Sequence, residues 1–410
     1  MDGSADAPLC DVETLMKLLL VHNRYQQRGG EDSVFDFESS LLERAGHDVH
    51  RLIATNEDIH SIKDKIDAAR GLTWNERGHA LVVEAIDRVK PDVMHVHNFF
   101  ALLSPSIYDA AAVANVPVVQ TLHNFRITCA NGLLLRDGSP CELCVEGSPL
   151  NAVRFRCYRG SVLASLALAR MIAFHRRKGT WLTKVARFIV LSEFARSRFV
   201  AAGLPAEKIV VKPNGALDSD LRAAASGKAV LFVGRLSIEK GVRTLLEAAH
   251  GLNCPVRIAG DGPLRSELEL LAPPNVTFLG RLSHDEVLSE MAHARCLVMP
   301  SLWYEQFPAT LVEAYSVGLP VIASRLGSLI ELVDDEITGL FFSPGDAGEL
   351  ARAIERLQKN GHLAAFMRQA TRRRYEELYS PDRTVRELEA IYNSTMTLRA
   401  PISVEPHRQF

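Results

Sequence analysis

The sequence predicts an α/β fold made of two doubly wound domains, each with a mostly parallel sheet. Short runs rich in Val, Leu and Ile recur without polar alternation, which is the pattern of strands buried on both faces. Amphipathic segments such as 33–45, 242–252 and 347–358 lie between these runs, so strand–helix units repeat along the chain. The runs that we expect to be strands are 18–21, 93–96, 117–121, 188–191, 229–233, 256–259, 276–279, 296–299 and 320–323.

Chain length and a Pro-Asn-Gly interruption predict the domain boundaries. A chain of 410 residues exceeds one ordinary hydrophobic core, and two domains of similar size are the simplest division. Pro213, Asn214 and Gly215 interrupt the chain within 212–227, where we place the hinge. Two such domains leave a cleft at the carboxyl ends of both sheets, which is where ligands bind in this class of fold. The expected parts are a disordered N-terminus at 1–15, a first domain at 16–213 with a Cys-rich insertion at 129–157, a second domain at 214–396 and a loose tail at 397–410.

Composition excludes several classes of protein. Hydrophobic residues make up 47% and charged residues 23%, and the net charge of -2 argues against a basic nucleic-acid-binding protein. The longest apolar stretch, 161–174, contains Arg170 and is shorter than the ~20 residues that span a bilayer. We therefore expect a cytoplasmic protein, soluble or peripheral at the inner face of the plasma membrane. Four acids stand where a secretory signal needs basic residues, namely Asp2, Asp6, Asp11 and Glu13.

Five motifs follow one another in the second half. They are Gly234-Arg235-Leu236, Glu239-Lys240-Gly241, Ala259-Gly260-Asp261-Gly262-Pro263, Pro300-Ser301 followed by Glu305 and Glu313, and Gly318-Leu319-Pro320-Val321. In this order and spacing the chain closely resembles the large family of retaining GT-B glycosyltransferases known as family four, or glycosyl transferases group 1. The resemblance implies a GT-B fold, a nucleotide-diphosphate sugar as donor and retention of the anomeric configuration. The first half matches the same family at Gly29-Gly30, Pro91-Asp92, His95-Val96-His97 and Thr121-Leu122-His123.

Arg235 and Lys240 follow a strand end and are candidates for receiving negative charge. Cleavage of a nucleotide sugar leaves charge on the diphosphate, which fixed cations stabilise. Many transferases use a divalent metal held by an Asp-x-Asp pair, but Asp334 and Asp335 are adjacent and lie in a polar turn. We predict catalysis without a metal or other cofactor. The alternative is that Arg235 and Lys240 are solvated loop charges.

Glu305 and Glu313 lie eight residues apart across the start of an expected helix, whose first turn can hold Pro308. By the resemblance, Glu305 contacts the donor sugar and Glu313 the ribose hydroxyls, while free amides at the helix start help to hold the diphosphate. Composition alone would favour two ordinary helix acids. The family is often Gly-rich after Glu305, whereas this chain has Gln306 there, so the sugar hydroxyls read at this point stay open. The other expected donor contacts are Gly260, Asp261, Gly262, Leu282, Phe307, Pro308 and Ala309.

Gly29 and Gly30 permit a ligand to approach the backbone closely. By the resemblance this loop faces the donor phosphates or the acceptor, and we include both glycines among the donor contacts. A plain turn is the alternative. Glu31 and Asp32 follow at an expected helix start, where the helix dipole favours acids, so we assign them no catalytic role.

His97, Asn98 and His123 follow strands of the first domain and should lie near the cleft. A histidine there can donate to a sugar hydroxyl or to developing charge without a metal. We assign His97 and Asn98 to the acceptor side; histidines satisfied inside the strand-end packing are the alternative. Because no second carboxylate is placed as a nucleophile, we favour front-face attack in which the leaving phosphate helps to deprotonate the acceptor. The catalytic candidates are Glu305, His123, Arg235 and Lys240.

Four cysteines follow the pattern C-x11-C-x2-C-x12-C in a segment with little helical or strand pattern. Thiolates in such small knuckles hold Zn²⁺ in tetrahedral geometry. Unpaired or packing thiols are an equal alternative, and an iron–sulfur cluster is a third. A metal held by four cysteines would be structural, because no coordination position stays open. The cysteines are Cys129, Cys141, Cys144 and Cys157.

Residues 154–198 carry eleven basic side chains and one acid, Glu193, which gives 11 - 1 = +10. Interleaved apolar residues such as Leu163, Leu166 and Phe174 suit this stretch to an anionic membrane surface that holds a lipid-linked acceptor. A solvated helix face or a pocket for an anionic acceptor are the alternatives.

The sequence as a whole predicts a hexosyltransferase. Its donor would be a UDP- or GDP-sugar, its acceptor a polysaccharide or lipid-linked glycan, and nucleic acid is not an expected partner. Two other classes stay open: an epimerase or phosphorylase of the same fold, and a non-catalytic sugar-nucleotide-binding partner of another transferase.

Overall fold

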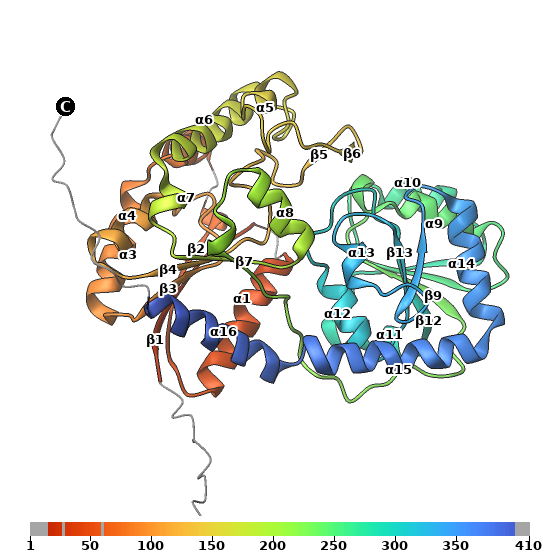
Figure 1. The fold of residues 1–410 in the computed structure, drawn as a ribbon. Coiled ribbons are helices and arrows are strands. Elements are labelled where there is room, and N and C mark those ends of the chain that lie inside the picture. The colour runs from red at the N-terminus through yellow and green to blue at the C-terminus, as the bar shows by residue number, and fades with distance from the viewer. Residues whose placement is uncertain (1–14, 27–28, 59–60, 398–410) are drawn as a thin grey trace, which may run out of the picture.

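The computed structural model describes residues 15–26, 29–58 and 61–397. Two α/β domains lie side by side, each built on one six-stranded parallel sheet (Figure 1). This confirms the predicted fold class. Most of the expected disordered N-terminus and of the loose tail lies outside the described residues.

The first sheet has the strand order β2-β1-β3-β4-β7-β8, and all neighbouring strands are parallel. Its strands are β1 (Lys17–Arg24), β2 (Asp48–Thr55), β3 (Val93–Val96), β4 (Val118–Thr121), β7 (Arg187–Val190) and β8 (Ile209–Val211), and a separate hairpin is formed by β5 (Leu135–Arg136) and β6 (Ser139–Pro140). Its helices are α1 (Gly30–Arg44), α2 (Ile62–Gly71), α3 (Glu76–Val89), α4 (Ser106–Val113), α5 (Asn151–Arg154), α6 (Val162–Lys178), α7 (Thr180–Thr183) and α8 (Glu193–Ala201), with 3-10 turns η1 (Asn56–Asp58) and η2 (Ala206–Lys208).

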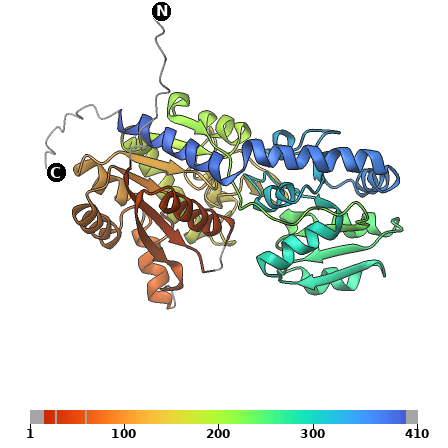
Figure 2. The same ribbon diagram turned by 90° about the horizontal axis from the view of Figure 1, so that it is seen from below.

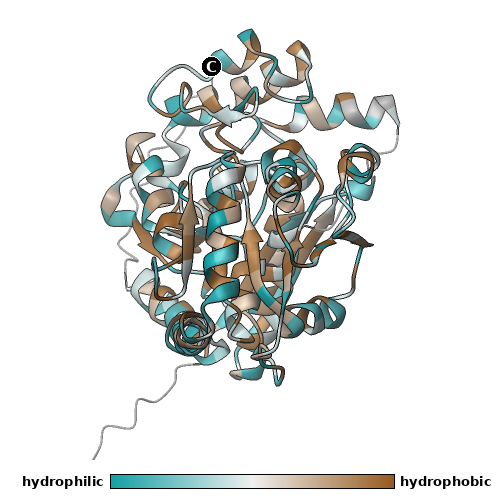
Figure 3. Ribbon diagram, turned by 90° about the vertical axis from the view of Figure 1, so that its right-hand side faces the viewer, coloured by the Kyte–Doolittle hydropathy of each residue, from teal (hydrophilic) through white to brown (hydrophobic). Residues whose placement is uncertain are grey.

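The second sheet has the order β11-β10-β9-β12-β13-β14 and is also parallel throughout. Its strands are β9 (Ala229–Val233), β10 (Val256–Ala259), β11 (Val276–Gly280), β12 (Ala294–Met299), β13 (Val321–Ser324) and β14 (Gly339–Phe342). The turn and helices around it are η3 (Ile238–Lys240), α9 (Val242–Ala249), α10 (Arg265–Leu271), α11 (His284–His293), α12 (Ala309–Ser316), α13 (Leu329–Leu332), α14 (Ala347–Lys359) and α15 (Gly361–Leu378), and α16 (Pro381–Met396) ends the described chain. Brown strands lie between helices with teal outer turns in Figure 3.

All nine runs expected to be strands fall on strands of the two sheets. The sheet strands missing from the expectation are β2, β8 and β14, which all lie at sheet edges. An edge strand is covered on fewer sides and needs no continuous apolar run, and β2 alternates exposed and half-buried positions. Edge strands are therefore the elements that an apolar-run criterion overlooks.

The chain crosses between the domains twice, and the two crossings touch. The first leads from β8 to β9, and the second separates α15 from α16, the two helices that run along both domains in Figure 2. The amide of Ala216 in the first crossing donates to the carbonyl of Tyr379 in the second at 3.1 Å. A Cβ on Gly215 would lie 2.2 Å from the hydroxyl of Thr384, so this contact requires glycine.

Helix α16 corrects the expected extent of the second domain, which we placed at 214–396. Its residues Leu388, Ile391 and Tyr392 pack in a core with residues of β1, β3 and β4 in the first domain. The Tyr392 hydroxyl also lies 2.7 Å from Nδ1 of His95. The chain thus returns to the first domain, where the apolar face of α16 is buried against the first sheet.

At the interdomain boundary, a carboxylate of the second domain caps a helix of the first domain. The carboxylate of Glu331 in α13 accepts hydrogen bonds from the amides of Glu193 at 3.1 Å and Phe194 at 3.2 Å, at the start of α8. The Phe194 ring lies 4.7 Å from that of Tyr304 in the second domain. Both contacts join the second domain to the same turn of the first. Among the described residues, none of the helices has the length and apolarity needed to cross a bilayer.

Candidate active site

A pocket of about 830 Å³ opens where β9 and β10 end, and its volume is suited to a small-molecule ligand. Most of its lining comes from the second domain, and Gln26 is contributed by the first. Four of the residues predicted to bind the donor, together with Arg235, lie in this lining. The complete lining is Gln26, Val233, Gly234, Arg235, Ala259, Gly260, Asp261, Gly262, Pro263, Arg281, Leu282 and Val287.

Glycines allow the two loops at the pocket to touch through their backbones. Gly260 has φ +134°, and a Cβ there would lie 1.8 Å from the carbonyl oxygen of Gly234. A Cβ on Gly262 would lie 2.4 Å from the carbonyl oxygen of Leu236. No side chain fits at either position without moving the backbone, so these glycines fix the shape of the pocket wall.

Lys240 and Glu305 form an ion pair near this pocket, although neither lines it. Nζ of Lys240 lies 2.7 Å from Oε1 of Glu305, and the Ser301 hydroxyl donates to the same oxygen at 2.7 Å. The Glu305 side chain is 5% exposed and that of Lys240 is 24% exposed. The ammonium group also lies 5.3 Å from the centre of the Trp303 ring. Two residues with separately predicted roles are therefore held as one unit, with the second oxygen of Glu305 outside both contacts.

In the first domain a buried chain of polar groups leads to His123. Nε2 of His123 lies 3.1 Å from Nδ1 of His97, and Nε2 of His97 lies 3.6 Å from Oε2 of Glu38. The other oxygen of Glu38 accepts from the ammonium group of Lys212 at 2.7 Å, and both of these side chains are at least 98% buried. Oε2 of Glu38 and Nε2 of His97 have no hydrogen-bond partner. The two orphan atoms face each other across a gap that is slightly too long for a direct hydrogen bond.

His95, His97 and His123 are neutral at ordinary pH. Burial lowers the pKa of both His97 and His123 well below the usual value, and neighbouring groups that include Lys212 lower it further. Burial and Lys212 also lower the pKa of His95 to about 3. Ligand atoms of Glu38, His95 and His97 lie within 4.8 Å of one another, as in a metal site. Lys212 already neutralises Glu38, and both ring nitrogens of His95 are hydrogen-bonded, so the cluster is a poor match for a cation.

Two family models match consecutive parts of the chain. The Glycosyl transferase 4-like domain matches residues 39–215, and Glycosyl transferases group 1 matches residues 217–374. The boundary between them lies at the first crossing between the domains. The chain belongs to the group 1 glycosyltransferases. Its two domains form the GT-B fold that the resemblance implied.

Individual relatives match this chain over different shares of its length. Alpha-D-kanosaminyltransferase of Streptomyces kanamyceticus is 34% identical over 148 residues, which cover 34% of this chain and only 38% of that one. The 2-deoxystreptamine glucosyltransferase of the same organism is 27% identical over 335 residues, 77% of this chain and 82% of the relative. The crystal structure of HepE from Anabaena in complex with UDP has a TM-score of 0.64 at 18% identity and covers 92% of this chain and 100% of its own. At that identity the likeness concerns the fold alone.

Glu313 faces a residue that sequence reasoning missed. Its carboxylate lies 3.5 Å from Nδ1 of His284, the first residue of α11, and this contact raises the pKa of His284. Leu282, which lines the pocket, precedes His284 by two residues. The signal in the sequence was a histidine two residues after Leu282, an expected donor contact.

Among the residues after Glu305, Phe307 packs in the core, whereas the side-chain amide of Gln306 has no hydrogen-bond partner. The Phe307 ring is 8% exposed and packs against Tyr379, so its contribution is to the core of the second domain. Pro308 is the N-cap residue of α12 and Ala309 its first residue. Gln306 is also 8% exposed, and neither its Oε1 nor its Nε2 has a hydrogen-bond partner. Buried amides are normally paired, so Gln306 is the residue here with unused binding capacity.

The start of α1 has free space next to Gly30 and an acid, Glu31, whose pKa is raised. Gly29 is the N-cap of α1, and a Cβ on Gly30 would meet no atom within 4 Å. Glu31, to which we assigned no role, accepts from the amide of Asn124 at 3.4 Å. Burial raises the pKa of Glu31 to about 7, within the physiological range. Asp32 behaves as expected of a helix-start acid and also accepts from the ring of His22 at 2.8 Å.

Asn98 is engaged within the first domain. Its amide nitrogen donates to the carbonyl of Asn23 at 2.7 Å, and its Oδ1 accepts from the amide of Phe100 at 3.0 Å. It is 6% exposed. These bonds hold the ends of β1 and β3 together, so its predicted contact with the acceptor stays a prediction.

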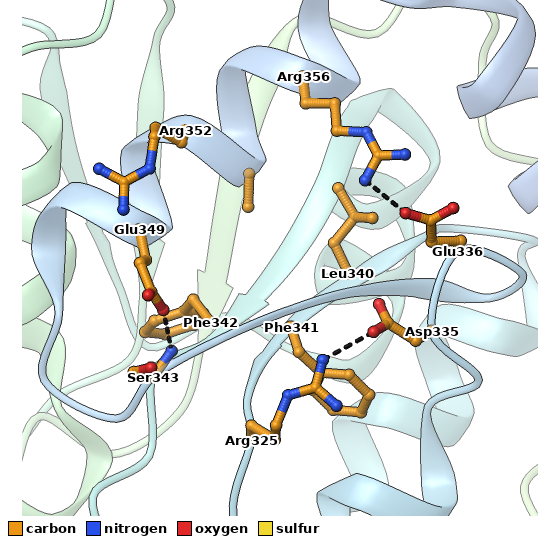
Figure 4. A pocket seen from close by; sticks show the side chains of 11 residues that line it. Arg325, Asp335, Glu336, Leu340, Phe341, Phe342, Ser343, Glu349, Arg352 and Arg356 are labelled. Carbon is orange, nitrogen blue, oxygen red and sulfur yellow. Dashed lines mark hydrogen bonds and ion pairs between the residues drawn. The ribbon is translucent and has the colours of Figure 1, made fainter.

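A second pocket, of about 500 Å³, lies at β14 and α14 (Figure 4). Arg325 pairs with Asp335 at 2.7 Å and Arg356 with Glu336 at 2.8 Å. The Glu349 carboxylate accepts from the amide of Ser343. Acids thus compensate most of its cations, which makes it less suited to a diphosphate than the pocket at β9 and β10.

Proposed function

We propose that the chain is a retaining hexosyltransferase that moves a sugar from a UDP- or GDP-sugar to a polysaccharide or lipid-linked glycan without a divalent metal. The observation that carries this proposal is the ion pair of buried Glu305 with half-buried Lys240, which follows the same strand, β9, at whose end the glycine-walled pocket of about 830 Å³ opens. A carboxylate held by a cation suits sugar hydroxyls, and Lys240 and Arg235 suit a diphosphate. The bound UDP of HepE supports a nucleotide donor by analogy of fold.

The proposed reaction balances without a co-reactant. The bond from the anomeric carbon to the diphosphate oxygen breaks, and the acceptor oxygen bonds to the same face of that carbon. The acceptor proton passes to the departing phosphate oxygen. Arg235 and Lys240 stabilise the charge that develops on the leaving group. Independence from metals is supported by Asp334 and Asp335, which pair with Arg374 at 2.8 Å and Arg325 at 2.7 Å and are thereby engaged.

Gln306 is proposed to read a hydroxyl of the donor sugar. Its amide carries one donor group and one acceptor group, both buried and unpaired. A sugar hydroxyl can satisfy both, and a site built to bond a hydroxyl rejects a donor that lacks it. This gives the Gln-Phe-Pro-Ala variation of the family motif a role in donor choice.

His123 is proposed to accept a hydrogen bond from a sugar hydroxyl. Oε2 of Glu38 is an acceptor atom 3.6 Å from Nε2 of His97, and a small movement would bring the two atoms within hydrogen-bond distance, so we place the proton of His97 on Nε2. Nδ1 of His97 then accepts from Nε2 of His123, which leaves Nδ1 of His123 as an acceptor. Glu38 and His97 are thus positioning residues, whereas His123 touches the substrate.

The acceptor side is proposed to meet an anionic membrane through α6. Exposed apolar residues recur at helical spacing on one face, with Leu163 77%, Leu166 44% and Phe174 40% exposed and Arg170 between them. Helix α6 lies along the outer edge of the first domain, away from the second (Figure 1). Acids elsewhere offset part of the +10 charge, since Lys178 and Lys184 both face Asp109. We expect the protein to bind anionic vesicles in preference to neutral ones.

Vesicle co-sedimentation tests the membrane contact. Leu163→Glu should abolish binding to anionic vesicles, and Leu270→Glu is the control because Leu270 is 87% exposed in the second domain. Equal binding of both variants would end this part of the proposal. A membrane contact at the inner face of the plasma membrane is consistent with the expected cytoplasmic location.

A thermal-shift screen with UDP, GDP, ADP and their sugars, with and without EDTA, tests the donor site. A ligand that binds only the folded state raises the melting temperature. We expect a shift selective for one diphosphate and insensitive to EDTA. Lys240→Ala and Glu305→Ala should fold and lose transfer by roughly 10²–10³-fold or more. Lys359→Ala, an exposed ion-pair lysine, is the matched control and should leave transfer unchanged.

Other outcomes separate the alternatives. Consumption of the donor without an acceptor would favour an epimerase, and consumption that depends on phosphate would favour a phosphorylase. Binding of a diphosphate without turnover on any glycan would favour a non-catalytic partner. Normal turnover in Lys240→Ala or Glu305→Ala would refute the site assignment.

A further inference from the structure

The segment 129–157 links β4 to α6 and contains little regular structure. All of its residues are described, and its regular elements are the two-residue strands β5 and β6 and the single-turn helix α5. Leu134, Val145 and Ala152 anchor it in the core of the first domain.

Four cysteines from separate parts of this segment gather in one place. The thiol of Cys144 lies within electrostatic range of Cys129, Cys141 and Cys157, and Cys157 lies within range of Cys129 and Cys141. Cys129 and Cys144 are each 8% exposed, and all four are free of disulfides. Cys141 directly follows the β5–β6 hairpin, and its amide donates to the carbonyl of Leu134 at 2.7 Å. The Cys-x-x-Cys pair therefore begins directly at the end of the hairpin.

Charged and polar groups surround the cluster. Arg136 and Asp137 both act on Cys157, and the thiol of Cys129 donates to Oδ1 of Asn131 at 2.9 Å. Arg176 donates to the carbonyl of Cys144 at 2.8 Å and interacts with its thiol. A zinc ion with four thiolates carries a net charge of -2, which amide donors and nearby arginines stabilise.

Reactive or catalytic thiols do not account for the cluster. Cys129 and Cys144 are each only 8% exposed, so reagents and substrates reach these two thiols poorly. Among the described residues, no three of the four sulfur atoms lie within 4.8 Å of one another. Coordination at the usual Zn–S distance of about 2.3 Å therefore requires the side chains to rotate inward.

We propose that Cys129, Cys141, Cys144 and Cys157 form a structural zinc site that fixes the segment 129–157 beside the interdomain boundary. Within this segment Glu142 pairs with Arg198 of α8 at 2.6 Å and interacts with Tyr304 of the second domain. The site thereby holds a contact that reaches both domains. It takes no part in the chemistry, because four thiolates leave no open position on the metal.

Metal analysis of the purified full chain tests the site. We expect about one zinc per chain in the wild type and less than about 0.2 in Cys144→Ser, because loss of one of four thiolates opens the coordination shell. Cys254→Ser is the matched control, since Cys254 is a free, half-buried cysteine of the second domain, and should retain about one zinc. Loss of zinc should also increase proteolytic cleavage within 129–157.

A second measurement covers variants that fail to fold. Wild-type protein exchanged with Co²⁺ should show the visible bands of tetrahedral thiolate coordination, and a strong chelator should remove them together with the protease resistance of 129–157. A folded, metal-free wild type that takes up no Co²⁺ would overturn the proposal. Equal zinc content in Cys144→Ser and Cys254→Ser would do the same. None of these measurements depends on transfer activity, so the zinc site and the proposed function can fail separately.

Discussion

The buried pair of Lys212 and Glu38 gives a quantitative test of the first domain. Nζ of Lys212 lies 2.7 Å from Oε1 of Glu38, and the two side chains are 1% and 2% exposed. Lys212→Met removes one partner and leaves a buried carboxylate 3.6 Å from His97, a histidine that burial keeps neutral. Breaking a buried pair in this way costs about 3–5 kcal/mol. At roughly 2–4 °C per kcal/mol for a domain of this size, the melting temperature should fall on the order of 10 °C.

The double variant Lys212→Met/Glu38→Gln distinguishes the charge effect from a packing effect. With both charges removed, most of the lost stability should return, because replacing a whole buried pair is often neutral. Lys90→Met is the control, since Lys90 and Asp87 are 2.9 Å apart but 71% and 69% exposed, and it should change stability by less than about 1 kcal/mol. Calorimetry on the four proteins measures the effect. Equal melting temperatures for Lys212→Met and Lys90→Met, or a double variant no better than Lys212→Met, would refute the reasoning.

Three further predictions concern the cleft. Gly30→Ala should leave stability unchanged or raise it by up to about 1 kcal/mol, because a Cβ there meets no atom and alanine favours a helix start, while it weakens donor binding in a titration if a ligand occupies that space. Gln306→Leu should lower the preference between donor sugars that differ in one hydroxyl at least tenfold in kcat/KM, and an unchanged preference would remove Gln306 from donor recognition. Glu31 has a folded pKa raised to about 7 by burial, so its contribution to stability is complete below its unfolded pKa of about 4.5 and is lost as pH rises through 7. The melting temperature of Glu31→Gln should therefore gain on that of the wild type between pH 5 and pH 8, and a constant difference would contradict the shift.

The fold was predictable because its signal is local. Strands buried on both faces must be apolar along their whole length, and every such run in the sequence proved to be a strand. The return of α16 to the first domain was not predictable in this way. Its apolar residues Leu388, Ile391 and Tyr392 show that it packs against something, but helical periodicity does not name the partner sheet.

Site residues that belong to sequence motifs were predictable, whereas contacts between residues distant in sequence were not. The glycines and Arg235 line the pocket because loop geometry requires them at fixed positions. The coupling of His123 to Glu38 through His97 joins residues that are distant in sequence, and no motif contains all three. Gln306 was visible only as a departure from a Gly-rich pattern, and its unpaired amide required the structure.

The two halves of the cleft are held in register by contacts around the start of α8. Glu331 caps this helix from the second domain, and Phe194 packs on Tyr304. Arg198 in the same helix binds Glu142 of the cysteine segment. The cysteine segment is thus linked, through Arg198, to the helix that carries both contacts with the second domain.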